Sequence, residues 1–250
     1  MSNTANLRLY DTHYHLDLSP DPAAIVRACE ARGIYTIAVT NAPSVFAATQ
    51  ALTANCKYVR AAIGMHPELV SSHGHELDQF FNALGQTRYV GEVGLDYVTS
   101  NSDDRARQRE VLTRILERCA NVGGKIVTLH SRRAAVDVIN AVGPGFPGHA
   151  ILHWYSGSLR ELKKAIDYGF HFSINPRMVV GESSLRLIDA MPRNRLLLET
   201  DGPFVKVSDR PADPRDAALV VEYLATKWAV TVESAADSLF ENFRQLVVTP

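Results

Sequence analysis

Short apolar and β-branched segments recur along this chain, and segments with helical periodicity separate them. Eight segments have the length and composition of strands: residues 7–13, 35–40, 59–65, 89–95, 125–130, 150–153, 170–175 and 196–201. Helical periodicity marks residues 22–32, 103–122, 133–142, 159–168 and 184–191, and two closing helices are expected at 214–228 and 232–246. Strands that alternate with helices pair in parallel through right-handed crossovers.

Eight such units predict an α/β fold, a single (β/α)8 TIM barrel with its active site at the C-terminal ends of the strands. A doubly wound open sheet is the alternative. The 250 residues are an ordinary length for one barrel, and no repeat, low-complexity tract or linker divides them. We therefore expect residues 1–250 to form one barrel domain.

The formal net charge is only −1, so the chain lacks the broad basic field with which many proteins bind duplex DNA. Any contact with nucleic acid must be local. The three cysteines, Cys29, Cys56 and Cys119, include no C-x-x-C pair and are expected to be buried free thiols in a reducing cytosol. Residues 1–6 show no secretory signal, and no run approaches the roughly 18 apolar residues of a membrane span. The prediction is a cytoplasmic protein without a membrane partner.

Histidines and acids lie at or near the C-terminal ends of five of the predicted strands. His13 and His15 are two residues apart, a spacing that turns both side chains to one side of a strand. The C-terminal strand ends of a barrel share one rim. Four imidazoles and two carboxylates at that rim form a ligand set suited to divalent metal ions: His13, His15, Glu92, His130, His153 and Asp201.

Each of these residues also has a purely structural interpretation. A lone histidine at a strand end is more often packed or capping than a ligand. Glu92 could be a buried salt-bridge partner, and Asp201 could be an N-cap. We interpret His73 and His75, which share the H-x-H spacing but lie in a polar segment, as solvated. Glu199 should share the face of Asp201 and could orient a ligand.

Seven short motifs are spread over the whole chain. They read DTHYH at residues 11–15, GMHP at 64–67, GEVGLD at 91–96, QREV at 108–111, HSR at 130–132, HWYSG at 153–157 and ETDGPF at 199–204. In this order they resemble the TatD-type deoxyribonucleases, a metal-dependent, amidohydrolase-like family. Within that family, residues 21–24 and 173–178 resemble QatD, the nuclease-like member of the four-gene Qat anti-phage cassette. The closer resemblance implies a role in antiviral defence, with partners among the proteins of such a cassette.

The family resemblance implies a centre with two divalent metal ions, for which zinc, manganese and magnesium all stay open. One ion would lie between His13, His15 and Asp201. The second would lie between the two later histidines, His130 and His153.

Glu92, as the bridge between the ions, and Asp201 are the catalytic residues that the resemblance implies. Asp201 would orient the attacking water and take its proton. His66 and Arg132 would contact the substrate phosphate, since a guanidinium pairs with phosphate through two hydrogen bonds; a solvated position at a helix start is the alternative for Arg132. The predicted activity is hydrolysis of DNA, as single strands or from an end, by a water activated between two ions.

Two rival functions stay open. A small-molecule amidohydrolase or lactonase could use the same metal centre, because barrels host many chemistries. Many such relatives bridge their metals with a carboxylated lysine, whereas the fourth strand offers Glu92 and no lysine, which favours phosphodiester chemistry. The other rival is a metal-binding subunit whose role is to assemble with other proteins of a defence complex.

Overall fold

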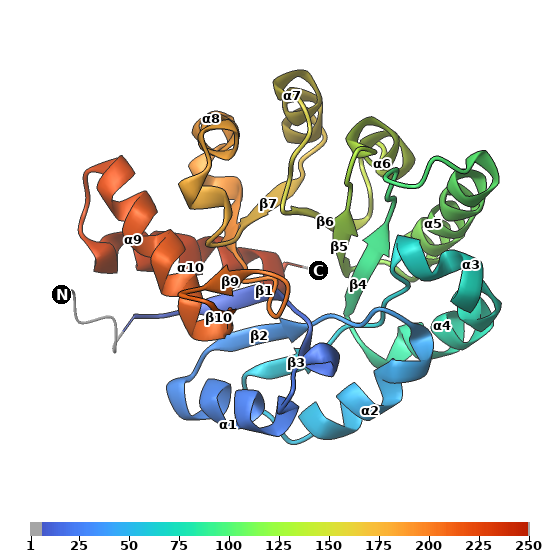
Figure 1. The fold of residues 1–250 in the computed structure, drawn as a ribbon, viewed down its shortest axis with the longest axis horizontal. Coiled ribbons are helices and arrows are strands. Elements are labelled where there is room, and N and C mark those ends of the chain that lie inside the picture. The colour runs from blue at the N-terminus through green and yellow to red at the C-terminus, as the bar shows by residue number, and fades with distance from the viewer. Residues whose placement is uncertain (1–6, 250) are drawn as a thin grey trace.

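The computed structural model describes residues 7–249 and arranges eight parallel strands in sequence order around a barrel (Figure 1). The strands are β1 Tyr10–Tyr14, β2 Tyr35–Ala38, β3 Val59–Ala61, β4 Tyr89–Gly94, β5 Lys125–His130, β6 Gly148–His153, β7 His171–Ile174 and β8 Leu196–Leu198. They form two ladders, β1-β2-β3 and β4-β5-β6-β7-β8. A doubly wound sheet would instead reverse its strand order part of the way across. The predicted (β/α)8 barrel is therefore confirmed.

Helices follow the strands and cover the outside of the barrel (Figure 1). They are α1 Pro22–Arg32, α2 Pro43–Thr53, α3 Val70–His73, α4 Leu77–Ala83, α5 Ser102–Val122, α6 Ala135–Val142, α7 Leu159–Asp167, α8 Glu182–Ala190, α9 Ala217–Trp228 and α10 Val232–Val248. Helix α1 shows why these boundaries form: the Asp21 side chain caps its start by accepting from Ala24 N at 2.8 Å. Gly33 ends it in the left-handed conformation, with φ at 66°, and returns the chain to β2.

Backbone hydrogen bonds join the two ladders between β3 and β4. Ile63 lies just beyond β3 and pairs with Val90. Its N–H donates to the Tyr89 carbonyl at 3.1 Å, and its carbonyl accepts from Gly91 N at 2.9 Å. The segment after β3 is thereby held against the strand that carries Glu92.

Several hydrogen bonds close the barrel between β8 and β1: Tyr10 Oη accepts from Leu198 N at 3.3 Å, and Thr12 Oγ1 donates to the Leu198 carbonyl at 3.0 Å. The Asp11 carboxylate accepts from the Thr200 amide at 3.1 Å and from the His13 amide at 3.0 Å. Burial raises the pKa of Asp11 to about 8, although the hydrogen bonds from Thr200 and His13 oppose this shift. Beyond the strands, Asp201 N donates to the His13 carbonyl at 2.9 Å. The closure therefore places two of the predicted metal ligands next to each other.

Several boundaries differ from the prediction. Strand β3 ends at Ala61 rather than at residue 65, because the segment after it pairs with β4 only at Ile63. Strand β8 ends at Leu198 rather than at residue 201, where the backbone turns into the left-handed region. The prediction also lacked helices α2 to α4 and a small hairpin, β9 (Lys206–Val207) and β10 (Arg210–Pro211). Two-residue strands are too short to show an apolar period in the sequence.

The three thiols are free, but they do not share one environment. Cys29 and Cys119 are buried as expected, whereas Cys56 is partly exposed because it lies beyond the C-terminal end of α2. Within residues 7–249, every helix is too short or too polar to span a bilayer. Residues 1–6, in which we expected no secretory signal, lie outside the described part of the chain.

Candidate metal centre

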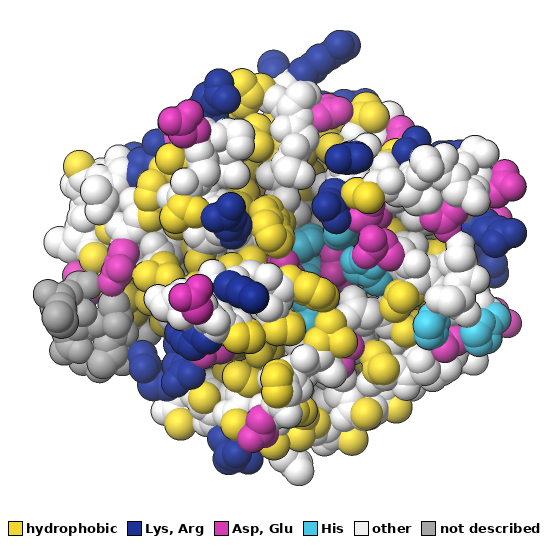
Figure 2. Space-filling view, in the orientation of Figure 1, with side chains coloured by type: hydrophobic (Ala, Val, Ile, Leu, Met, Phe, Trp, Pro, Cys, Tyr) yellow, Lys and Arg dark blue, Asp and Glu magenta, His cyan; other side chains and the backbone are white. Residues whose placement is uncertain are grey.

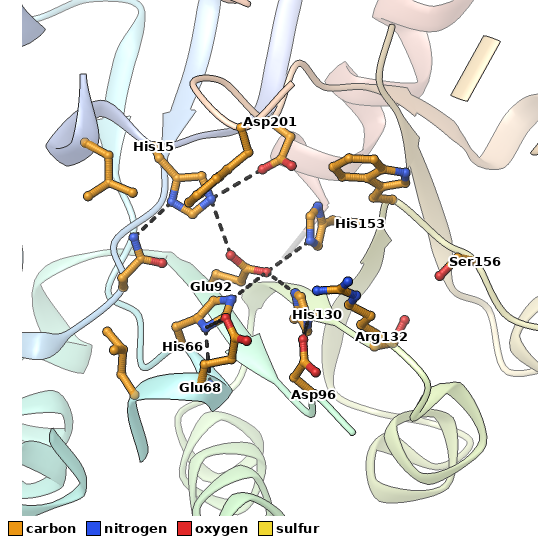
Figure 3. Close-up of a pocket in the computed structure, with 16 residues that line it drawn as sticks. His15, His66, Glu68, Glu92, Asp96, His130, Arg132, His153, Ser156 and Asp201 are labelled. Atoms are coloured by element: carbon orange, nitrogen blue, oxygen red, sulfur yellow. Dashed lines mark hydrogen bonds and ion pairs between the residues drawn. The ribbon is translucent and has the colours of Figure 1, made fainter. Parts of the chain in front are cut away.

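The C-terminal strand ends surround a cavity of about 730 Å³, and histidine and acidic side chains gather in this hollow (Figure 2). Seven of the eight predicted site residues line the cavity (Figure 3): His15, His66, Glu92, His130, Arg132, His153 and Asp201. The eighth, His13, is fully buried, with its ring stacked on that of His153 at a centroid distance of 3.9 Å. The fold thus brings all of these residues to one place.

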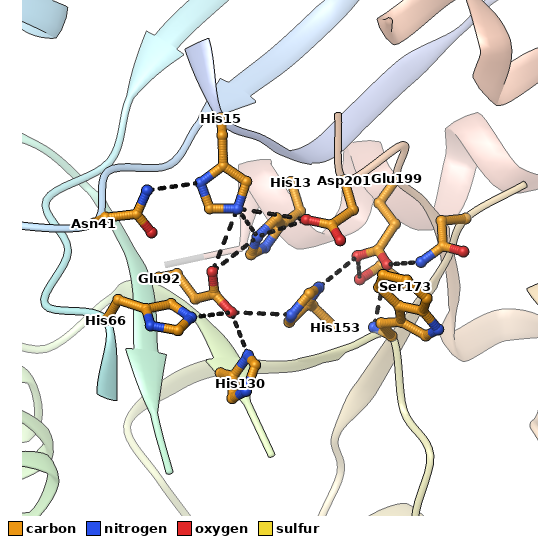
Figure 4. A network of polar contacts seen from close by, with 12 residues as sticks. His13, His15, Asn41, His66, Glu92, His130, His153, Ser173, Glu199 and Asp201 are labelled. Atoms are coloured by element: carbon orange, nitrogen blue, oxygen red, sulfur yellow. Dashed lines mark hydrogen bonds and ion pairs between the residues drawn. The ribbon is translucent and has the colours of Figure 1, made fainter. Parts of the chain in front are cut away.

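Two imidazole nitrogens, from His13 and His15, each lie close to two carboxylate oxygens, from Glu92 and Asp201 (Figure 4). The Nε2 atoms of His13 and His15 are 3.2 Å apart, and each lies 3.4 Å from Glu92 Oε2. Asp201 Oδ1 completes this first group, 3.6 Å from His13 Nε2 and 3.4 Å from His15 Nε2. All four side chains are buried.

The distances among His13, His15 and Asp201 fit three ligands of one divalent ion, and Glu92 Oε2 lies beside both imidazoles. Ligand atoms at about 2.0 to 2.1 Å from a tetrahedral ion stand roughly 3.3 Å from one another. The observed separations of 3.2 to 3.6 Å are long for hydrogen bonds but suit atoms that share one central ion. The two imidazoles and two carboxylates of the first group are also chemically suitable ligands for a transition metal.

The other oxygen of Glu92 faces a second group of imidazoles. Glu92 Oε1 is 2.6 Å from His130 Nδ1, 3.0 Å from His153 Nε2 and 3.6 Å from His66 Nε2. Since Oε2 faces the first group, the two oxygens of one carboxylate serve two separate groups (Figure 4). A carboxylate that bridges two ions needs this arrangement. The 2.6 Å contact with His130 is a hydrogen bond, so an ion bound there would replace a proton.

Imidazole neighbours favour the charged form of Glu92. Burial opposes ionisation, but the neighbouring imidazoles outweigh burial and hold the pKa of Glu92 well below its usual range. Burial and the nearby His153 lower the pKa of His13. A neutral His13 keeps a nitrogen lone pair with which to bind an ion.

Close backbone packing holds Glu92 in position. Its N–H donates to the Thr40 carbonyl at 3.0 Å, and its carbonyl accepts from Met65 N at 2.9 Å. Gly64 makes this approach possible, because a Cβ atom there would lie 1.7 Å from the Thr40 carbonyl oxygen. A side chain at residue 64 would push apart the segments that carry Glu92 and His66.

A turn, rather than a continued strand, presents Asp201 to the first group. Asp201 has a left-handed backbone conformation, with φ at 51°. Its carbonyl accepts from Phe204 N at 2.9 Å and from Val205 N at 3.1 Å. The predicted extension of the eighth strand to residue 201 is wrong, although Asp201 still reaches the expected rim.

Arg132 is exposed where two hollows meet. It lines the main cavity, and together with Ser131 and Ser156 it also lines a neighbouring cavity of about 330 Å³. Arg133 lines that second cavity as well. This position suits the predicted contact of Arg132 with an anionic substrate.

Residues 10–247 match the model of the family described as TatD related DNase. The chain belongs to this family. Membership confirms the prediction of a metal-dependent hydrolase that acts on ester bonds.

The TatD-related chain is similar to proteins from several organisms. The uncharacterized metal-dependent hydrolase YjjV of Escherichia coli K12 is 28% identical over 97% of this chain and 99% of YjjV. The crystal structure of YjjV has a TM-score of 0.84 at 27% identity and covers 98% of this chain and 100% of that chain. Deoxyribonuclease Tat-D of Schizosaccharomyces pombe is 28% identical over 62% of this chain and 55% of its own length. The organophosphorus hydrolase of Deinococcus radiodurans shares the fold alone. Its sequence is 10% identical, and its structure has a TM-score of 0.57 over 98% of this chain and 94% of that chain.

Two further carboxylates of this TatD-related site contact His130 and His153, each at the ring nitrogen that does not face Glu92. Asp96 Oδ2 is 2.8 Å from His130 Nε2, and Glu199 Oε2 is 3.5 Å from His153 Nδ1. Such carboxylates set the tautomer and direction of a ligating histidine. The orienting role expected for Glu199 has this contact in its support. Asp96 was missed, although it is an acid at the end of the GEVGLD motif and could have been found by the same signal.

A backbone N–H that donates to Nδ1 distinguishes His66 from the other histidines of the TatD-related site. His66 Nδ1 accepts from Glu68 N at 3.3 Å, so the neutral ring carries its proton on Nε2. A ring in this state donates a hydrogen bond instead of binding an ion. The geometry therefore favours the predicted substrate contact, even though His66 lies within one possible ligand group with Glu92 and His130.

Asn41 is a site residue that the sequence did not reveal. Its amide lies 3.2 Å from His15 Nδ1 (Figure 4). The amide nitrogen Nδ2 is the atom that faces the ring; a half-turn of the amide would bring Oδ1 there instead, where it would accept the Nδ1 proton and leave Nε2 of His15 for an ion. Asn41 belongs to no motif that we could interpret, and only the packing of the segment after β2 brings it to the site.

Proposed function

We propose that this TatD-family hydrolase is a deoxyribonuclease that cleaves single-stranded DNA or works from a DNA end at a two-metal centre. The observation that carries the proposal is the position of Glu92, whose two carboxylate oxygens face two separate imidazole groups. Two ions suit in-line displacement at phosphorus, because charge develops on both the attacking and the leaving oxygen. The name of the S. pombe relative, a deoxyribonuclease, supports DNA as the substrate.

Six side chains would hold the two divalent ions: His13, His15, Glu92, His130, His153 and Asp201. Imidazole and carboxylate ligands suit zinc and manganese and also admit magnesium. The ions would supply positive charge for the phosphate oxygens and lower the pKa of an attacking water.

Three side chains would act on the reactants directly. Asp201 faces the first group through Oδ1, and its other oxygen would accept the proton of the attacking water. His66 would donate from Nε2 to a phosphate oxygen, in the tautomer that its contact with Glu68 selects. Arg132 would pair with the same phosphate or the next one along the strand.

The size and charge of the site favour a single strand. A cavity of about 730 Å³ has the volume of a small-ligand pocket, which suits part of one strand better than a duplex. The net charge of −1 leaves little long-range attraction for duplex DNA. Arg132 and Arg133, in the adjoining cavity, would supply the local contacts for a strand that leaves the site.

Labelled DNA tests the nuclease proposal. Purified protein is incubated with 5′- and 3′-labelled single and double strands plus Mn²⁺, Mg²⁺ or Zn²⁺, and elemental analysis gives the metal content per chain. We expect cleavage that EDTA stops and that Asp201→Ala slows by roughly 100- to 10,000-fold. Arg118→Ala, on the exposed side of α5, is the matched control and should cleave normally. The proposal would be refuted if neither EDTA nor Asp201→Ala changed the cleavage products. Hydrolysis of lactones without DNA cleavage would favour the amidohydrolase rival.

We further propose that the nuclease acts in the cytoplasm as part of a Qat-type anti-phage cassette. The support is the resemblance of residues 21–24 and 173–178 to QatD. The second of these stretches reaches the site, because Asn175 Nδ2 donates to Glu199 at 3.0 Å. In a phage plating assay, His13→Ala combined with Asp201→Ala should abolish protection. Full protection by that double variant would favour the assembly-subunit rival.

A further inference from the structure

An exposed aromatic ring stands at the rim of the metal-site cavity. Phe204 is 60% exposed and is the most exposed aromatic side chain within residues 7–249. It lines the same cavity as Glu92 and Asp201. Leu18, 44% exposed, lines that cavity too. Large apolar side chains left open to water beside a catalytic centre indicate contact with an apolar part of a ligand.

The ring of Phe204 is held in place by the residues of the first group. It makes a T-shaped contact with the ring of His15, with centroids 4.9 Å apart and planes at 86°. Its backbone N–H donates to the Asp201 carbonyl at 2.9 Å. Phe204 is therefore positioned relative to the metal centre, while much of its surface remains open to a ligand.

A second aromatic residue, Trp154, lines the cavity directly after His153. Its backbone is in the left-handed region, with φ at 40°, where bulky side chains are rare. Its N–H donates to Glu199 Oε1 at 3.1 Å, and Glu199 also contacts His153. The unusual backbone conformation is thus tied to the second group, as expected of strain that serves a site.

These two aromatic residues have a clear role if the centre cleaves DNA, and this inference rests on that proposed function. A phosphodiester at the metal centre carries one nucleotide on each side, and flat apolar side chains are the usual partners of unpaired bases. Bases in a duplex are stacked on one another and cannot offer their faces to a protein. We propose that Phe204 and Trp154 are stacking surfaces for unpaired nucleobases next to the scissile phosphate. The site would then require an unpaired strand and would tolerate any base sequence, because every base has a π-face.

A strand without bases tests the proposal independently of cleavage. A short fluorescently labelled phosphorothioate oligonucleotide, which slows cleavage, is compared by anisotropy with a strand of equal length made of abasic residues, both with Mg²⁺ present. We expect Phe204→Leu to weaken binding of the base-bearing strand by roughly 5- to 150-fold. Binding of the abasic strand should not change, and Phe204→Trp should retain binding of the base-bearing strand. Leu52→Ala, an exposed apolar position at the far end of α2, is the control that leaves both affinities unchanged.

Fluorescence provides a second measurement for Trp154. The chain has two tryptophans, so Trp228→Phe leaves Trp154 as the single tryptophan. The base-bearing strand should quench its emission and the abasic strand should not. Equal binding of both strands by the wild type, or unchanged affinities in Phe204→Leu and Trp154→Leu, would overturn the stacking proposal while cleavage of DNA still stood. Failure to bind either strand, together with no cleavage, would overturn the proposed function and this inference with it.

Discussion

In the histidines of this centre, the contact made by one ring nitrogen determines whether the other nitrogen can bind an ion. His130 has a carboxylate at both nitrogens, Glu92 at Nδ1 and Asp96 at Nε2. With the Nε2 proton donated to Asp96, Nδ1 is left for an ion. His66, in contrast, has a backbone N–H at Nδ1 and keeps its proton on Nε2. Residues of one type, a few ångströms apart, thus have different chemical roles.

The substitution Asp96→Asn should weaken metal binding. The amide keeps the size of the side chain and can accept a hydrogen bond, but it lacks the charge that makes His130 a good ligand. We expect the affinity for one of the two ions to fall by about 10- to 100-fold, measured by titration calorimetry on protein freed of metal by EDTA. Asp103→Asn, exposed in the first turn of α5, should bind metal like the wild type. Equal affinities in both variants would contradict the orienting role.

The loop after β8 is the element that shapes the site most. It contains Asp201 in the left-handed region and continues through the hairpin β9–β10. Gly202 lies where the end of this loop returns, because a Cβ atom there would be 2.1 Å from the Ala212 carbonyl oxygen and 2.7 Å from Tyr14 Cε2. The glycine therefore allows a closer approach of the hairpin than any residue with a Cβ atom would.

Gly202→Ala should consequently destabilise this protein. Backbone atoms cannot move aside as a flexible side chain can, so we expect a loss of about 1 to 3 kcal/mol. For a chain of this size the loss corresponds to a melting temperature lower by roughly 2 to 12 °C, measured by calorimetry. Gly85→Ala is the matched control, since its Cβ would meet nothing within 4 Å. Equal melting temperatures for the two variants would show that the loop can adapt.

For the whole molecule, the metal centre joins distant parts of the barrel. The two groups draw ligands from β1, β4, β5, β6 and the loop after β8, which meet only in the folded chain. Ions that bind only the folded state stabilise it by about 2.7 kcal/mol per site at 100 times the dissociation constant. Metal and fold should therefore be linked in thermal unfolding.

Adding Mn²⁺ or Zn²⁺ to metal-free protein should raise the melting temperature by roughly 5 to 11 °C for each site filled, as followed by calorimetry. Glu92→Gln should lose most of this increase because both groups share that carboxylate. Glu222→Gln, on α9, serves as the control and should keep the full increase. The shared role of Glu92 would be refuted by an undiminished rise in Glu92→Gln.

The opposite end of the barrel contains a pH-sensitive group. His171 is buried at the start of β7, and burial, together with Arg195 and His149, lowers its pKa to about 3. The folded pKa lies below the unfolded value of about 6.5, so the unfolded chain takes up the proton first on acidification. The stability that the neutral ring contributes is complete above pH 6.5 and is lost as the pH falls toward 3.

His171→Gln should therefore flatten the acid side of the stability profile. Between pH 6.5 and 4.5, we expect wild-type stability to fall by up to about 1.4 kcal/mol per pH unit more than that of the variant, in urea unfolding. His75→Gln, an exposed histidine, should follow the wild type. Parallel profiles for the wild type and His171→Gln would mean that the buried ring is protonated in the folded state.

Much of the fold and the membership of the site could be predicted from the sequence. Strand and helix patterns indicated a closed barrel, and in a closed parallel barrel all C-terminal strand ends meet at one rim. Histidines and acids at those ends, such as His130 and His153, therefore had to come together wherever the helices packed. The same logic would have included Asp96 had it been applied to every acid near a strand end.

Tertiary structure alone determines the chemical role of each of these side chains. The opposing contacts of the two Glu92 oxygens, the tautomer of His66 and the arrival of Asn41 depend on hydrogen bonds between segments far apart in the chain. The left-handed turn at Asp201 depends on the His13 carbonyl and the returning hairpin. A periodic pattern records which face of a strand is buried, but atom-to-atom distances of a few ångströms arise only when the packed backbones meet.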